Sequence, residues 1–453
     1  KPGVRYFFAN NYIPNVRYLI KIKEMKRKGI SIMLAMFGLF HVSAQNGIME
    51  LSLSKAIELA IDKNVKVQNA SLEFQKAHIH LKEAQSKLYP QLEGYSNFSY
   101  YYAIPKLIIP GEIFGQTGLI PVEIGTKYDW SSGFKATQVL FNQSYFTSLK
   151  LARQMENLSE LSLHQQKEEI VYHVSQVYFL CLATSGQIDE MEKTLKNTNK
   201  LLDIAQLQYE NEIIRRTDYS RVQVNKNNLL TQIDNLRQLH AQQLGLLKYL
   251  IGIELETNIS LSDTLSLPQN DISFELPDFS NRTEIKLIDQ QLGITMLSRR
   301  VNRQSYLPSL TAFSQYYYQG QRNEFDFFKG ANDKFFKVGF VGLSLAVPIF
   351  DGFERHYKSQ KYNIELMQLQ NTRSNTTIYF TKEFTDAVRQ YESNLNAVHR
   401  QQENVKVAEE SYDVSLLGYR QQVVTLSDLL LAESSLIEAR LSHLNALLQL
   451  KNA

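Results

Sequence analysis

The chain has 453 residues, enough for two or three ordinary domains, and contains 20 glycines and 10 prolines. So few glycines and prolines argue against a many-turned all-β protein and against a disordered chain. The net charge of +3 is unevenly spread, because residues 1–44 carry eight Lys/Arg and one Glu. The remaining 41 basic and 45 acidic side chains give −4 and form no clustered basic face, so we predict no nucleic-acid partner.

The basic amino-terminal segment is typical of a secretory signal peptide. Met25 and three basic residues precede an apolar run from Ile30 to Val42, and small residues follow up to Ala44. The run is shorter than the ~18–20 apolar residues that a membrane-spanning helix needs, which disfavours a membrane anchor. We therefore expect residues 25–44 to be a signal peptide and residues 1–24 to be an upstream extension absent from the natural product.

A helix followed by paired strands is predicted next. Residues 50–88 show apolar positions at helical spacing, Ser54 is a candidate N-cap, and the helix should end before Pro90. Residues 128–140 then alternate apolar with polar side chains, and residues 92–102 are rich in aromatics. We predict that these two segments form a β-hairpin within residues 90–141.

The strand pattern returns in the second half of the chain, at residues 310–318 and 335–347, within a hairpin predicted for 308–350. One apolar face, one polar face and many aromatics suit a transmembrane hairpin. A half-buried soluble sheet is the alternative, but two such hairpins alone would leave long open edges. Closing those edges requires further copies of the chain.

Long polar helices are predicted after each strand pair. No proline interrupts residues 142–209 or 351–417, and each stretch carries apolar residues spaced by three and four, which predicts supercoiled packing. Cys181 lies on one such apolar stripe and is the only cysteine, so a packing role is expected for it. The intervening faces are polar, as in the wall of a hollow structure rather than a globular core.

Each long helix is expected to turn and return as a shorter antiparallel helix, at residues 219–253 and 429–451. Residues 254–282 between the halves contain prolines, asparagines and aspartates and read as an irregular crossover with a short strand. The two turns are similar in sequence: Tyr209 and Tyr419 each precede an acidic residue, Asp218 and Asp428, by the same interval.

This repetition over roughly 210 residues indicates a duplicated domain rather than a solenoid. We divide the chain into the upstream segment and signal peptide, a first repeat at 45–253, a crossover at 254–282 and a second repeat at 283–453. The predicted fold class is mainly α with a membrane β-barrel, built from a repeated unit of long helices and a β-hairpin.

The sequence resembles the TolC-like outer-membrane efflux proteins over roughly residues 48–450. The local similarities are the opening helix at 51–60, the strand starts at 88–92 and 306–310, the strand-to-helix exits at 139–143 and 347–352, and the second turn at 418–430. The resemblance implies a homotrimer in the outer membrane of a Gram-negative cell. Its 12-stranded β-barrel would continue as an α-helical barrel through the periplasm, with residues near 254–282 forming a belt.

The resemblance also implies the function and its partners. The chain would be the passive exit duct of a tripartite efflux or type I secretion system, moving small molecules or proteins outward. A periplasmic adaptor and an inner-membrane pump of the RND or ABC type would be its partners, beside outer-membrane lipid. The cargo and the class of pump stay open.

The resemblance places a gate at the tips of the helical hairpins. Asp428 matches a gate aspartate, and three copies of it around an axis would bind cations. Thr217 and Asp218 match tip residues that accept a link from Tyr419, while Leu431 stands where a second acidic residue is usual. An alternative is that Asp218 and Asp428 only N-cap the return helices.

No catalytic motif accompanies these features, so no enzyme, metal site or cofactor is predicted. The sequence contains no phosphate-binding glycine loop, nucleophile elbow, zinc-binding His-Glu-x-x-His or cysteine pair. His78 and His80 are two apart on a helix and face different sides. A structural or adhesive coiled-coil envelope protein is the alternative function, although it would not need two aromatic strand pairs.

Overall fold

The computed structural model describes residues 48–267, 274–329 and 335–453. The predicted signal peptide at 25–44 and the extension at 1–24 lie outside the described residues. The chain divides into two units, and the larger one, residues 51–255 and 261–453, contains all the α-helices and the four-stranded sheet described below. The described part of the smaller unit contributes most of the short strands β1 (Met49–Leu51) and β6 (Ile259–Leu261), which pair with each other.

The elements of the first half confirm the predicted order of helix, strands, long helix and return helix. They are α2 (Leu53–Lys63), α3 (Val65–Ser86), β2 (Gln91–Tyr100), β5 (Tyr128–Phe141), α4 (Gln143–Glu210) and α5 (Arg216–Ile251). The second half repeats that order. Its elements are α6 (Thr283–Gln304), β7 (Ser309–Arg322), β8 (Phe336–Ala346), α7 (Glu354–Arg420) and α8 (Leu426–Asn452).

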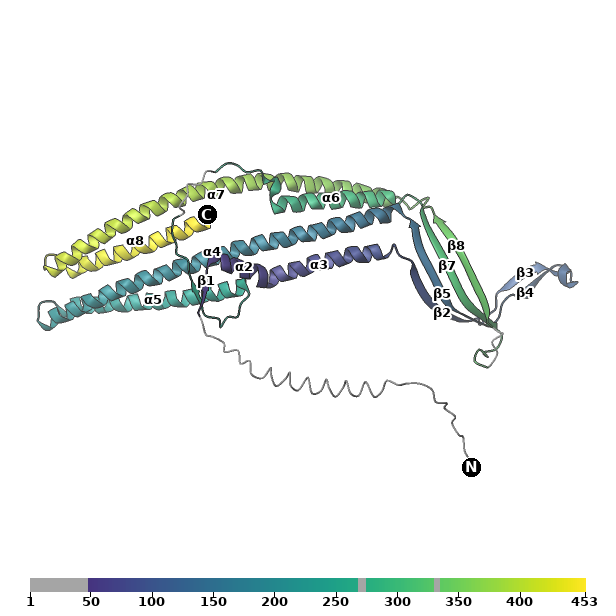
Figure 1. The fold of residues 1–453 in the computed structure, drawn as a ribbon, viewed down its shortest axis with the longest axis horizontal. Helices are drawn as coiled ribbons and strands as arrows, with labels where there is room; N and C mark the ends of the chain where they lie inside the picture. Colours follow the sequence, from purple (N-terminus) through teal and green to yellow (C-terminus); the bar gives the residue numbers. More distant parts are fainter. Residues whose placement is uncertain (1–47, 268–273, 330–334) are drawn as a thin grey trace, which may run out of the picture. The chain divides into compact units, whose positions relative to one another are not determined.

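Four strands form one antiparallel sheet in the order β2-β5-β7-β8 (Figure 1). Both predicted hairpins, β2 with β5 and β7 with β8, are confirmed. The pairing of β5 with β7 was not predicted and joins the two halves of the chain along 13 residue pairs. In consequence β2 and β8 are the edge strands, each bonded on one side only.

The register gives this sheet two different faces, because residues paired across antiparallel strands point the same way. One face is apolar and aromatic. It carries Leu92, Phe98, Tyr128, Trp130, Phe134, Tyr316, Tyr318, Val341 and Leu343. The other is mainly polar, with a minority of aromatic residues. It carries Glu93, Asn97, Asp129, Ser131, Lys135, Thr137, Gln315, Gln319 and Gln321.

The helices continue the order of the strands. Next to the sheet, α3, α4, α6 and α7 lie side by side in that order, and farther away α5 packs on α4 while α8 packs on α7 and α4 (Figure 1). The uninterrupted 68-residue α4 starts at an N-cap, Asn142, whose side chain accepts a bond from the Tyr145 amide at 3.0 Å. Among the described residues, no helix is both long and apolar enough to cross a lipid bilayer.

The single helix predicted for residues 50–88 is wrong in two respects. The helix is broken at Asn64, whose backbone is extended and whose side chain caps α3 and donates to the Leu250 carbonyl at 2.7 Å. Gly252 packs so closely on the Lys63 carbonyl that a Cβ there would lie 2.6 Å from it. The N-cap of α2 is Ser52 rather than Ser54. A tertiary contact with the end of α5 therefore sets the break.

The loop between β2 and β5 contains a ribbon that the sequence did not predict. It consists of β3 (Lys106–Pro110) and β4 (Leu119–Glu123), paired antiparallel around a short 3-10 turn. The predicted crossover after α5 does contain a short strand, β6. Asp263, just beyond that strand, accepts a bond from the Leu53 amide and lies 2.7 Å from the buried Tyr178 hydroxyl on α4.

The close approach of β5 to β7 depends on glycine at position 133. A Cβ there would lie 2.3 Å from the Tyr316 carbonyl oxygen and from the Tyr317 Cβ, so Gly133→Ala should separate the strands. We expect a loss of about 1–3 kcal/mol of stability, measured as a lower midpoint of thermal loss of β-sheet circular dichroism. Gly94→Ala is the control, since its nearest atom is 3.6 Å away. Equal midpoints for the two variants would contradict the prediction.

Candidate functional site

The two hairpin turns have the same backbone geometry. After α4, Glu212 is left-handed at φ 58°, and after α7 Gln422 is left-handed at φ 63°. The amide of the next residue bonds back to Gln208 in the first turn at 2.8 Å and to Gly418 in the second at 2.9 Å. This is the Schellman helix ending, built here on a non-glycine residue, which costs about 1 kcal/mol at each turn.

An apolar cluster holds the ends of the two hairpins together within the chain. It draws buried residues from α4, α5, α7 and α8. They are Leu201, Ala205, Val222, Tyr419, Leu426 and Leu429. Tyr209 and Tyr219, from the two sides of the first turn, stack beside it with ring centroids 5.7 Å apart and planes inclined by 3°. The hairpin ends are therefore one packed unit rather than two separate tips.

The predicted tip residues lie in this unit, but the expected link between them is different. Tyr419 is 6 % exposed, and its hydroxyl donates to Gln208 Oε1 at 2.9 Å rather than to Thr217 or Asp218. Burial raises the pKa of Tyr419, and the nearby Asp218 carboxylate raises it further. Thr217 is exposed at the surface of α5. Within one chain the tyrosine thus joins the second hairpin to α4.

Neither aspartate is the N-cap of its return helix, so that alternative is wrong. The N-cap of α8 is Thr425, which accepts from the Asp428 amide at 3.2 Å and donates its hydroxyl to Asp428 Oδ2 at 2.6 Å. The N-cap of α5 is Arg215, without a side-chain cap. Both aspartates occupy the third helical position, where a carboxylate stabilises the helix dipole. Asp428 is exposed and Asp218 is half-buried.

Arg221 makes the polar contact between the hairpins that sequence reasoning missed. Its Nη1 donates to Ser427 Oγ at 2.7 Å and lies 3.9 Å from Asp218 Oδ1. Beside it is a surface hollow of about 730 Å³. Its lining residues are Arg216, Thr217, Ser220, Arg221, Val224, Asn225, Asn228 and Leu430. Nothing in the local sequence marks Arg221, because its partner is 206 residues away.

A buried carboxyl group lies deeper between the hairpins. Glu433 on α8 is 4 % exposed, and its two oxygens lie 2.9 Å from Thr198 Oγ1 on α4 and 2.9 Å from Asn225 Nδ2 on α5. Burial raises the pKa of Glu433 above its ordinary value, and the two hydrogen bonds only partly offset this. The residue therefore joins three helices at a point closed to solvent.

The hydrogen-bond geometry suits a protonated Glu433. The Thr198 hydroxyl has one proton but lies near two acceptors, the Thr194 carbonyl at 3.0 Å and Glu433 Oε1. If Glu433 carries a proton on Oε1, it donates to Thr198, Thr198 donates to Thr194, and Asn225 donates to Oε2. Every group is then satisfied, whereas the ionised form leaves the two acceptors in competition for one proton.

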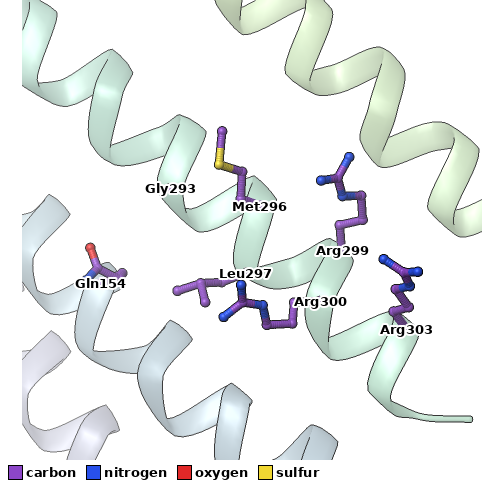
Figure 2. Close-up of a pocket in the computed structure, with 7 residues that line it drawn as sticks. All are labelled: Gln154, Gly293, Met296, Leu297, Arg299, Arg300 and Arg303. Carbon is purple, nitrogen blue, oxygen red and sulfur yellow. The ribbon is translucent and has the colours of Figure 1, made fainter.

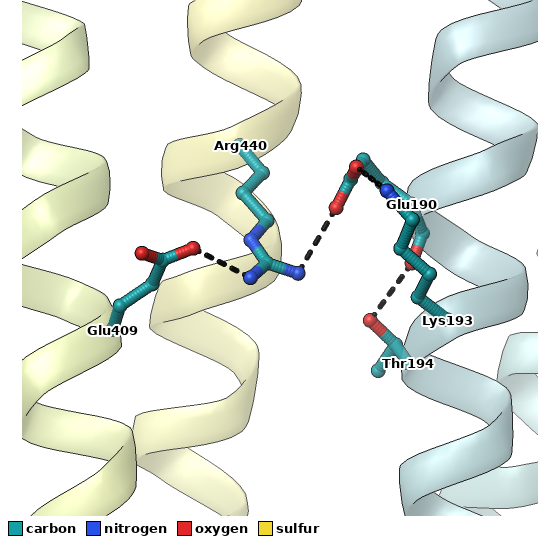
Figure 3. A network of polar contacts seen from close by, with 5 residues as sticks. All are labelled: Glu190, Lys193, Thr194, Glu409 and Arg440. Atoms are coloured by element: carbon teal, nitrogen blue, oxygen red, sulfur yellow. Dashed lines mark hydrogen bonds and ion pairs between the residues drawn. The ribbon is translucent and has the colours of Figure 1, made fainter.

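An ion-pair network joins α8 to α4 and α7 nearer the sheet (Figure 3). Arg440 on α8 donates to Glu190 on α4 at 2.9 Å and to Glu409 on α7 at 2.6 Å. Glu190 also pairs with Lys193 at 2.7 Å. Half-buried guanidinium pairs of this kind add orientation as well as energy, because the planar fork holds both carboxylates at once.

The described part of the chain offers no group of three or more His, Cys, Asp or Glu residues that could hold a metal ion. The single cysteine, Cys181, is fully buried on α4, and burial raises the pKa of its thiol to about 12, which agrees with the predicted packing role.

Comparison with solved structures identifies the architecture. The Campylobacter jejuni CmeC outer membrane channel aligns with a TM-score of 0.71 at 17 % identity, covering 88 % of this chain and 83 % of that one. The chain has the fold of the TolC-like outer-membrane channels. The outer membrane protein VceC of Vibrio cholerae (TM-score 0.67, 14 % identity, 88 % and 93 % covered) shares this channel fold.

The open state of the Neisseria gonorrhoeae MtrE outer membrane channel also has this fold, with a TM-score of 0.67, 16 % identity and 88 % of each chain covered. No protein-family model and no curated protein sequence matches the chain. The channel fold confirms the predicted combination of a β-barrel with a helical barrel.

We predict that Glu433 makes a pH-dependent contribution to stability. Because its folded-state pKa is raised above 4.5, the contribution is complete below that pH and is lost as pH rises through the folded-state value. Glu433→Gln mimics the protonated form, so we expect its stability to fall less between mildly acidic and neutral pH. Glu433→Ala should lose about 1–3 kcal/mol of folding stability at all pH values, since it leaves the side chains of Thr198 and Asn225 without this hydrogen-bond partner.

The measurement is the midpoint of thermal unfolding across pH for the helical signal. Glu438→Gln, an exposed carboxylate on the same helix, is the control and should leave the profile unchanged. A Glu433→Gln profile parallel to that of the unmodified chain would contradict the assignment.

Proposed function

We propose that the chain is the outer-membrane exit duct of a tripartite efflux or type I secretion system. The observation that carries this proposal is the two-faced sheet with two unpaired edges, attached to a row of long helices. An apolar face suits lipid and a polar face suits a water-filled channel. The resemblance of the fold to outer-membrane channels supports the same location, with the helices in the periplasm.

Three copies of the chain would pair the edge strands that a single chain leaves unpaired. Joining the edge strand β2 of one copy to β8 of the next would give a closed barrel of 12 strands and remove both edges. The outer helices of the row, α3 and α7, expose apolar side chains that would meet in the same contact. They are Val65, Leu72, Ile79, Tyr357, Ile364, Met367 and Ile378.

Each repeat would contribute one β-hairpin and one helical hairpin to the part of the trimeric channel that one chain forms. We place them at 45–253 and 283–453, with residues 254–282 as part of a belt around the helices. The Leu53 amide and the Tyr178 hydroxyl both donate to the Asp263 carboxylate, which supports a fixed position for that segment on α4.

The hairpin ends would form the gate. Asp428 is exposed at the start of α8, where a threefold axis would bring three copies together. Asp218, Thr217 and Tyr419 would control the contact between the first and the second helical hairpin. The contacts from Arg221, Glu433 and Arg440 would keep the gate closed. A periplasmic adaptor would dock on the hairpin ends, and an RND or ABC pump of the inner membrane would supply energy.

A structural or adhesive coiled-coil protein of the envelope is the alternative. It would share the long helices and the polar networks. It gives no reason for nine apolar and aromatic side chains to gather on one face of the sheet, seven of them exposed in the described structure.

Conductance in a planar lipid bilayer tests the proposal. Detergent-purified mature protein should migrate as a trimer and give small, uniform, cation-preferring current steps. A monomeric protein that neither floats with lipid vesicles nor conducts would reject the duct and favour the coiled-coil alternative.

Removing the charge of Asp428 should change ion preference. Asp428→Asn keeps the acceptor for Thr425, so the turn should remain folded while three charges leave the entrance. We expect the cation-to-anion permeability ratio, taken from the reversal potential in a salt gradient, to fall roughly two- to tenfold. Asp234→Asn, an exposed carboxylate on α5, is the control. An unchanged ratio would remove Asp428 from the gate.

A further inference from the structure

Three arginines gather at the carboxyl end of α6, beside the start of the sheet. Arg299, Arg300 and Arg303 line a hollow of about 470 Å³ together with Met296 and Leu297 of the same helix (Figure 2). Gln154 on the neighbouring α4 completes the opposite wall. The hollow thus combines three positive charges with two apolar side chains.

These arginines have no counter-charge. Among the described residues, no carboxylate lies within ion-pair distance of any of them, and the one hydrogen bond is from Arg299 to Asn363 Oδ1 at 2.7 Å. Some other arginines of the helices are paired, for example Arg373 with Asp289 at 2.6 Å and Arg440 with two glutamates.

Acidic residues near the same end of the helices are paired with other basic side chains. Glu156 on α4 lies 2.6 Å from His78. On the α7 side, Asp351 pairs with Arg355 at 3.4 Å and Glu354 with Lys358 at 2.5 Å. The three arginines lie within five residues of one helix, so an anion from outside the chain would offset their positive charge.

The position of the hollow along the chain indicates which anion it would meet. Helix α6 ends at Gln304 and β7 begins at Ser309, so Arg299 and Arg303, about 6 Å apart along the helix, lie within a few residues of the sheet. Tyr306 lies between them and the sheet, half exposed, with the Arg355 guanidinium 5.0 Å from its ring centre. Tyrosine and arginine at this level are typical of a membrane interface.

We propose that this arginine hollow binds the phosphate of an anionic phospholipid headgroup at the periplasmic surface of the outer membrane. The guanidinium forks bind phosphate oxygens in pairs, and Met296 and Leu297 cover the first carbons of an acyl chain. The proposal rests on the proposed function, because it needs the sheet to lie in the membrane.

Native mass spectrometry of the detergent-purified, delipidated protein tests the site, with phosphatidylglycerol added as the probe. The variant Arg299→Gln/Arg300→Gln/Arg303→Gln should bind phosphatidylglycerol about tenfold more weakly or worse. Replacement of the same three residues by Lys should give an intermediate loss, because charge remains but the fork does not. The control removes three exposed charges on α7 far from the sheet: Arg389→Gln/Arg400→Gln/Lys406→Gln.

Two comparisons separate the sources of phosphate. Phosphatidylcholine should bind more weakly than phosphatidylglycerol, and excess inorganic phosphate should displace little lipid. Equal retention by the triple Gln variant and the control, equal binding of the two lipids, or full displacement by inorganic phosphate would each overturn the lipid site.

The readout requires neither conductance nor a closed gate. A protein that conducts but loses no lipid affinity in the Gln variant overturns only this site. A protein that fails the bilayer test overturns the proposed duct, whatever its affinity for phosphatidylglycerol. Unchanged circular dichroism of each variant shows that the comparison is made between folded proteins.

Discussion

The pairing of β5 with β7 is the contact on which the rest of the structure depends. It joins the last strand of the first half to the first strand of the second along 13 residue pairs, with one register shift between Val139 and Phe141. Once these strands are neighbours, the helices that adjoin them, α4 and α6, must also be neighbours, and α3 and α7 become the outer members of the row. The same pairing leaves β2 and β8 with unsatisfied backbone groups. The proposed assembly of several copies of the chain would pair these two edges.

The helices lack a thick apolar core, and this explains their polar networks. Buried residues form small clusters spaced along the helices, such as the six at the hairpin ends and the group around Met191, Leu229 and Ile233. Between the clusters, Glu433 and Arg440 fix the rotation of α8 against α4. Polar contacts of this type are directional, so they set which faces meet, while the clusters supply most of the stabilisation.

The hairpin ends combine strain with tight packing. Two non-glycine residues hold left-handed backbones directly next to the buried cluster that unites the hairpins. A buried carboxyl that favours its proton lies two turns away. The proposed gate would thus be held by contacts whose strength depends on local charge, and loss of the Glu433 proton would weaken them.

Much of this architecture could be predicted from the sequence, because it depends on local patterns. The 3.6-residue and two-residue periods, the absence of proline from the long helices and the repeat of Tyr209 at Tyr419 identified the helices, strands and turns. Long-range contacts were not visible in that way. Asn64 breaks a predicted helix because it bonds to Leu250, Tyr419 bonds to Gln208 instead of Asp218, and Thr425 rather than Asp428 caps α8. Only tertiary structure brings together partners such as Thr198 and Glu433, since their chemistry depends on burial that no local pattern records.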